Sequence, residues 1–309
     1  MDKGKITIVT AFFPLKREEW KKFERPNNKY LEYFEFWARI QNDMIIYTDA
    51  ETSKYVEKIR KEQYNRDNTK IIVIEDWKKI DEECYIKIKN VMKNNLAVNF
   101  KMYSTFPEAW NADYNYMTNM KSWFIQDVVN KNLASGMIAW VDFGFNHGGE
   151  YYVDSEDFNF EWQYNFEKDK ITLFTINDID NLPVFEICRR MNSYIQGNVM
   201  VAPDYLWIEF WKLVRKNILA LASVGLADDD QTITLMAYNE EKEKFKILKT
   251  EKWFSMLQQY GNKNFKIKEE EKKKFIKLRK IKQKIKYVKN LKKYLKFWYR
   301  VLKNEEMKG

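Results

Sequence analysis

Short apolar runs rich in β-branched residues alternate, over the first 250 residues, with longer segments whose apolar positions recur every three or four residues. The first pattern is typical of buried strands and the second of helices that cover a sheet. Strands are expected at 6–13, 44–48, 70–74, 137–142 and 171–176, and at 194–203 after a turn. Helices are expected at 30–40, 53–64, 107–130 and 205–222. The β-α-β-α-β order of the first five elements predicts an α/β fold with a mostly parallel sheet flanked by helices.

Two acidic stretches lie beside apolar runs and mark a candidate site. Asp142 directly follows the run 137–141, and an acidic triplet, 228–230, precedes a second strand-like run at 232–236. Ligands of open α/β sheets bind at the carboxyl edge of the strands, so we expect the two stretches to line one shared cleft. The plainer alternatives are a turn cap for Asp142 and a solvated helix N-terminus for the acidic triplet.

Residues 266–309 differ from the rest of the chain and form a predicted basic tail. They hold 18 Lys and Arg against 5 Asp and Glu, a net charge of +13, which leaves −4 for residues 1–265. Apolar residues of the tail recur at heptad-like steps of three and four. Three interpretations stay open: a helix on an anionic membrane surface, a packing or coiled-coil helix, and a nucleic-acid contact. Interleaved aromatic residues favour the membrane, and the acidity of the body fits poorly with a nucleic-acid substrate.

Composition limits the class of protein further. With 45% hydrophobic residues the chain is able to bury a sizeable core, and two cysteines with one histidine nearly exclude a disulfide scaffold and a Cys/His zinc site. No apolar stretch approaches the ~20 residues that span a bilayer. Residues 1–5 lead directly into the first strand without a signal-peptide pattern. We therefore expect a cytoplasmic protein that is soluble or peripheral on a membrane.

Both common glycine-rich phosphate loops are missing, because no G-x-G-x-x-G follows the first strand and no G-x-x-x-x-G-K-[ST] occurs. A divalent cation held by carboxylates does the same work for a diphosphate, since hard oxygen ligands bridge protein and phosphate. Asp142 is a candidate ligand of such a cation. His147, the only histidine, is a candidate ligand or base, although a surface histidine is the commoner case.

Other candidate contacts are weaker one by one. Gly197 and Asn198 would let a ligand approach the backbone closely, and an ordinary turn explains the pair equally well. Lys121, Arg17 and Arg25 are able to pair with phosphate, although each alone is more often a surface charge.

With these motifs assembled, the chain resembles the bacterial HtrL/YibB family over roughly residues 5–250. The resemblance is carried by the stretches 7–13 and 44–49, Pro107-Glu108, Tyr114-Asn115, Lys121, the Trp-Val-Asp-Phe-Gly motif at 140–144 and the Asp-Asp-Asp-Gln motif at 228–231. The family is associated with lipopolysaccharide-core gene regions, so the resemblance implies surface-glycan assembly.

More distantly, the layout looks like a GT-A nucleotide-sugar glycosyltransferase, in which a strand ends in an Asp-x-Asp that holds Mn²⁺ or Mg²⁺. Asp142 matches the first Asp, but Gly144 stands at the second, which puts metal dependence in doubt; a carboxylate of the acidic triplet, or His147, would have to complete the shell. The resemblance implies that Asp229 or Asp230 is catalytic. It implies substrate contacts from Thr10, Ala11, Lys121, Asp142, Gly197, Asn198 and Gln231 and metal ligands at Asp142 and His147.

The prediction is thus a GT-A-like domain at 1–265 with a basic amphipathic helical tail at 266–309. We expect it to move a sugar from a nucleotide-sugar donor to a lipid-linked surface glycan at the inner face of the cytoplasmic membrane, with the tail on anionic lipid and no nucleic-acid partner. The alternatives are a non-catalytic membrane-associated glycan-assembly protein and nucleic-acid binding through the tail.

Overall fold

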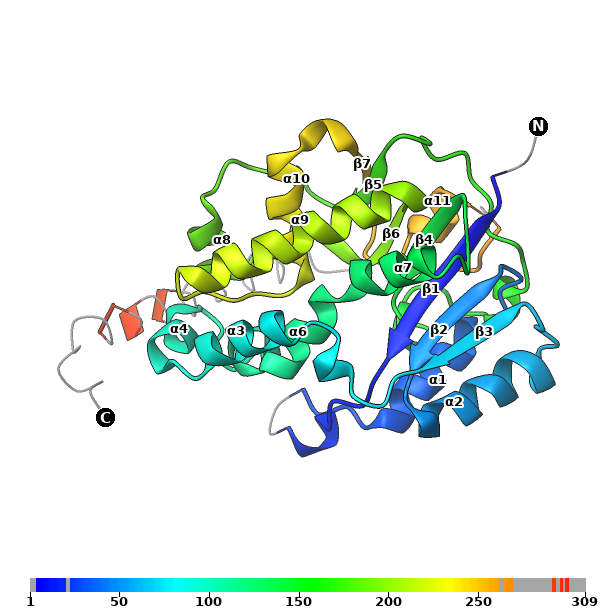
Figure 1. The fold of residues 1–309 in the computed structure, drawn as a ribbon, viewed down its shortest axis with the longest axis horizontal. Coiled ribbons are helices and arrows are strands. Elements are labelled where there is room, and N and C mark those ends of the chain that lie inside the picture. Colours follow the sequence, from blue (N-terminus) through cyan, green and yellow to red (C-terminus); the bar gives the residue numbers. More distant parts are fainter. Residues whose placement is uncertain are drawn as a thin grey trace, which may run out of the picture.

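The computed structural model describes residues 4–20, 23–261 and 264–268, with six further residues between 291 and 299. Seven strands form one sheet in the order β3-β2-β1-β4-β6-β5-β7 (Figure 1). β3, β2, β1 and β4 are parallel, β6 is antiparallel to both of its neighbours, and β7 is parallel to β5. The strands are β1 (Ile6–Phe12), β2 (Met44–Thr48), β3 (Thr69–Val73), β4 (Met137–Val141), β5 (Ile171–Thr175), β6 (Ile195–Pro203) and β7 (Phe245–Lys249).

Helices cover both faces of the sheet, and the central strands therefore feed two apolar cores. In β1, Ile8 belongs to the core that also holds residues of α1, whereas Val9 belongs to the core beneath α7 and α9. α7 and α9 lie side by side across that second face (Figure 1). The helices are α1 (Asn27–Trp37), α2 (Ala50–Glu57), α3 (Glu82–Met92), α4 (Asn95–Phe100), α5 (Pro107–Trp110), α6 (Ala112–Asn119), α7 (Lys121–Asn130), α8 (Val184–Arg190), α9 (Asp204–Ser223), α10 (Asp230–Glu240) and α11 (Met256–Gln259).

The predicted fold class is confirmed. Each expected strand between residues 6 and 176 is present with ends shifted by at most one residue, because buried parallel strands leave a clear apolar run in the sequence. The helix predicted at 205–222 is α9, and the one predicted at 30–40 is α1, which begins three residues earlier. The helix predicted at 53–64 is α2 continued by a short π-helix, Lys58–Gln63.

Three local predictions were wrong. The single helix at 107–130 is divided into α5, α6 and α7, because the extended backbone of Asn111 ends one helix and its Oδ1 accepts from Tyr114 N at 2.8 Å to cap the next. The strand-like run at 232–236 is part of α10, which begins after Asp229. Gly197 lies inside β6 and not in a turn.

Most of the basic tail predicted at 266–309 lies outside the described residues. The part nearest the body is attached to it, since Ile267 forms a β-bridge with Tyr152 and Lys268 N donates to Tyr151 O at 2.8 Å. Within the described residues, no helix has both the length and the apolar character that crossing a membrane requires.

Candidate functional site

A pocket of about 210 Å³ opens where β1 and β4 end, at the carboxyl edge of the parallel strands. Its floor comes from the ends of these strands, including Ala11 and Asp142, and its walls come from α1, α6, the N-terminus of α7 and the turn that follows β4. Asn198 of β6 completes the lining beside Trp253. The position agrees with the general location of ligand sites in open α/β sheets.

Lys121, the first residue of α7, connects the two acidic stretches. Its Nζ lies 2.9 Å from Asp142 Oδ1 and 2.8 Å from Asp230 Oδ2, and it donates to Gly197 O at 2.7 Å. The side chain is buried, which alone would lower the pKa of Lys121, but the two carboxylates outweigh burial and the pKa is raised. Lys121 therefore joins Asp142 to Asp230, but the predicted shared cleft is not lined by both stretches: in the described lining Asp142 faces the pocket and the acidic triplet does not.

Among the described residues that line this pocket, Asp142 is the only one with a carboxylate. Its Oδ1 accepts from Trp140 Nε1 at 2.7 Å in addition to pairing with Lys121, and its backbone N–H donates to Asn198 O at 2.9 Å. These contacts fix the carboxylate while its side chain stays 36% exposed. Asp142 is therefore held in place yet open to a ligand.

Gly197 is required by the close approach of α10 to β6. A Cβ at this position would lie 1.9 Å from Asp230 Oδ2, which no side chain tolerates. The glycine thus allows Asp230 to reach Lys121 across the backbone of β6. This is a packing requirement, and it replaces the turn that the sequence suggested.

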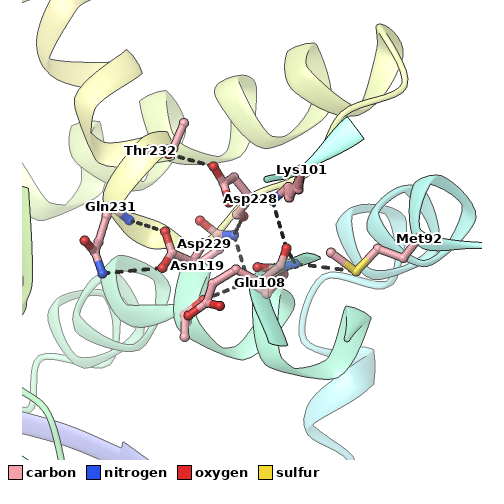
Figure 2. Close-up of polar contacts among 10 residues, drawn as sticks. Met92, Lys101, Glu108, Asn119, Asp228, Asp229, Gln231 and Thr232 are labelled. Carbon is pink, nitrogen blue, oxygen red and sulfur yellow. Dashed lines mark hydrogen bonds and ion pairs between the residues drawn. The ribbon is translucent and has the colours of Figure 1, made fainter. Parts of the chain in front are cut away.

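The acidic triplet is buried, and the side chains of Asp228 and Asp229 point toward different partners (Figure 2). Asp228 pairs with Lys101 Nζ at 2.6 Å and accepts from Thr232 Oγ1 at 2.8 Å. Asp229 caps α10, accepting from Gln231 N at 3.2 Å. Burial, and then the charges of Asp230 and Asp228, raise the pKa of Asp229 well above its ordinary value.

The catalytic role predicted for Asp229 and Asp230 has no direct support in this geometry. Both side chains are less than 10% exposed, and neither lines the pocket in the described part of the chain. Burial also raises the pKa of Asp230, opposed by Lys121, which lowers it. The structure gives Asp230 a different part, which is to position Lys121 against Asp142.

The other predicted substrate contacts are placed unevenly. Asn198 lines the pocket and donates through Nδ2 to Trp253 O at 2.9 Å, while its Oδ1 is buried and has no partner in the described residues. Ala11 lines the pocket. Thr10 and Gln231 do not, since Thr10 is fully buried in β1 and the Gln231 side chain turns toward Asp229 at 3.4 Å.

The predicted metal ligands, Asp142 and His147, line the same pocket, but the donor set does not fit a divalent cation well. His147 Nδ1 is engaged by Glu150 Oε2 at 2.7 Å, and Asp142 Oδ1 already faces an ammonium. Mg²⁺ and Mn²⁺ require several oxygen ligands. Within the described residues, no three His, Cys, Asp or Glu side chains are grouped closely enough to hold an ion.

Sequence reasoning missed the groups that support the acidic triplet. Lys101 is the buried counter-ion of Asp228 and also donates to Glu108 O at 2.8 Å. Burial raises the pKa of Glu108, and the nearby charge of Asp228 raises it further. Because 127 residues separate Lys101 from Asp228, no local pattern announces the pair.

Comparison with known proteins assigns the chain to a protein family. Residues 4–262 match the family model described as a bacterial protein of unknown function, HtrL_YibB. The chain belongs to the HtrL/YibB family. Protein HtrL of Escherichia coli (strain K12) is 30% identical to it over 270 residues, which cover 82% of this chain and 92% of that protein. The resemblance inferred from the motifs is thus confirmed.

Solved glycosyltransferase structures show weaker similarity. Mouse xyloside xylosyltransferase 1 in its apo form matches with a TM-score of 0.41 and 12% identity, over 79% of this chain and 85% of that one. The PaToxG glycosyltransferase matches with a TM-score of 0.32 and 11% identity, over 76% of this chain and 69% of that one.

Proposed function

We propose that this protein of the HtrL/YibB family is a glycosyltransferase that moves a sugar from a nucleotide-sugar donor to a lipid-linked surface glycan. One observation carries the proposal: a single carboxylate, Asp142, stands exposed in a pocket at the carboxyl edge of the sheet and is oriented by buried Lys121 and by Trp140. A purely structural aspartate would not need a buried cation and an indole N–H to hold it open to solvent.

In this proposal Asp142 meets the transferred sugar or the acceptor hydroxyl. Its carboxylate is able to accept hydrogen bonds from sugar hydroxyls, or to take the proton of the attacking hydroxyl as that oxygen bonds to the sugar carbon and the nucleoside diphosphate leaves from the same carbon. Asn198 lines the pocket beside Asp142 and holds the strand end in place, since its backbone O accepts from Asp142 N at 2.9 Å. The buried Lys121–Asp230 pair behind Asp142 keeps the geometry fixed and costs no reorganisation when substrate binds.

The basic tail would keep the enzyme near its lipid-linked acceptor. With +13 on residues 266–309 and −4 on the rest, an anionic membrane surface attracts the tail and not the body. Holding the enzyme at the surface raises the effective concentration of acceptor. Liposome flotation of the full chain and of a variant ending at residue 265 tests the membrane role of the tail, and equal binding by the two proteins would count against that role. In a separate DNA-binding assay, salt-sensitive binding that is lost with the tail would favour the nucleic-acid alternative.

The catalytic proposal is tested by assaying a panel of nucleotide sugars for hydrolysis and transfer with the wild type and Asp142→Asn. Asparagine keeps the size of the side chain but cannot accept a proton, so we expect turnover to fall by about 10²-fold or more. Asp169→Asn is the matched control, because this aspartate is 72% exposed and pairs only loosely with Lys170 at 3.6 Å. Equal turnover in wild type and Asp142→Asn would refute the role of Asp142 and favour a non-catalytic assembly protein.

A further inference from the structure

Two arginines lie at the mouth of the pocket, on the segment between β1 and α1. Arg17 and Arg25 both line it, and Arg25 N donates to Arg17 O at 3.3 Å, which holds this segment closed on itself. Both guanidinium groups pack against the ring of Tyr30, whose centre lies 5.7 Å from Arg17 Cζ and 5.3 Å from Arg25 Cζ. The indole of Trp20 packs on Arg17 from another side, at 4.6 Å.

Neither guanidinium is neutralised within the described residues. No ion pair to Arg17 or Arg25 is present there, and Arg17 Nε is buried without a hydrogen-bond partner. Arg25 makes one long side-chain hydrogen bond, to Tyr30 Oη at 3.5 Å. Arg17 donates through Nη1 to Tyr30 Oη and through Nη2 to Phe23 O at 3.2 Å. The other Nη hydrogens of both side chains have no partner among the described residues and remain available to a ligand.

The pocket therefore carries separated charges. At its base Lys121 is committed to Asp142 and Asp230, so these groups leave no excess positive charge for a ligand. At its mouth Arg17 and Arg25 add two positive charges that meet no carboxylate in the described lining. A ligand that satisfies both ends has an anionic part at the mouth and a neutral part with hydroxyl groups at the base.

We propose that Arg17 and Arg25 bind the diphosphate group of the donor and take over the charge neutralisation that a divalent cation supplies in a metal-dependent site. This rests on the proposed function, because it assigns one part of the same donor. Guanidinium groups match phosphate oxygens with two parallel N–H bonds, and both groups are pre-oriented by Tyr30 and Trp20. The poor fit of Asp142 and His147 to a metal ion agrees with this assignment.

The test is calorimetric titration of the full chain with inorganic pyrophosphate, first in EDTA and then with MnCl₂. We expect the wild type to bind in EDTA, and Arg25→Gln to bind about tenfold more weakly or worse, as expected for lost hydrogen bonds to a charged group. Arg17→Gln should weaken binding in the same way. Arg17→Lys keeps the positive charge but loses the paired N–H donors of the guanidinium, and should weaken binding less. Arg190→Gln is the control, because Arg190 pairs with Glu186 away from the pocket. The basic tail is identical in all variants.

Two results would overturn the assignment: pyrophosphate binding that needs Mn²⁺, or binding that Arg25→Gln and Arg17→Gln both leave unchanged. Sugar transfer by the wild type would then still support the proposed function. Conversely, pyrophosphate binding in EDTA that is lost in Arg25→Gln would keep the arginine site even if no nucleotide sugar were turned over. Thermal melting of each variant shows whether it is folded. If Arg17→Gln does not fold, Arg25→Gln decides the test, because Arg25 is the less tightly packed of the two arginines.

Discussion

Replacing Lys121 by methionine would remove the ammonium that joins Asp142 to Asp230. Asp230 is 8% exposed at its side chain and would be left as a buried charge without a counter-ion, whereas Asp142 is 36% exposed and water would take over much of its solvation. Removing one partner of a buried ion pair typically costs about 3–5 kcal/mol. We expect Lys121→Met to lower the free energy of unfolding by that amount, with Asp230 responsible for most of it.

A second variant tests the cause of this loss. In Lys121→Met/Asp230→Asn the unpaired buried charge is absent, so the double variant should be clearly more stable than the sum of the single effects predicts. The difference in stability between Lys121→Met and the wild type should also be smaller at acidic pH than at neutral pH. Without Lys121 the pKa of Asp230 rises further, and the protonated carboxyl needs no counter-ion.

Guanidinium chloride unfolding of the full chain, followed by circular dichroism, measures these differences. Lys131→Met is the control at the other end of α7, since Lys131, 53% exposed, pairs with Asp127 at 2.7 Å. Removing this exposed ammonium should cost at most about 1 kcal/mol, because Asp127 keeps its hydrogen bond from Tyr47 Oη at 2.7 Å. If Lys121→Met cost no more than Lys131→Met, or if Lys121→Met and Asp230→Asn were additive, the central position of Lys121 would be refuted.

Two further predictions concern the acidic triplet and its neighbours. Gly197→Ala should displace Asp230, because the added Cβ would lie 1.9 Å from Asp230 Oδ2. The free energy of unfolding should fall by about 1–3 kcal/mol, and any transfer activity should fall with it. A melting temperature equal to that of the wild type would contradict the contact. Asp229 has a raised pKa in the folded protein, so the wild type loses stability as pH rises from near the ordinary value of 3.8 through the raised value. Asp229→Asn keeps the helix cap and carries no charge, so its stability relative to the wild type should rise with pH. Asp229→Ala should lose about 1 kcal/mol because the cap is lost. Unfolding curves at several pH values check both expectations.

Much of the fold follows from local sequence pattern. The runs at 44–48 and 137–141 lie in the middle of the sheet with helices on both faces and leave unbroken apolar stretches, so the strands were predicted to within one residue of their ends. Asp142 follows one of them, and the sequence alone therefore places it at the carboxyl edge of the sheet. The alternation of strands and helices determined the class of the fold for the same reason.

The tertiary structure alone decided how these parts combine. The run 232–236 has residues suited to either a strand or a helix, and packing against α9 and β6 makes it helical. Only the close approach of α10 to β6 shows why position 197 is glycine and why Asp230, not Asp229, reaches Lys121. Likewise, the pairing of Lys101 with Asp228 joins residues 127 positions apart. Such contacts depend on the distance between folded elements, which the order of residues along a chain does not encode locally.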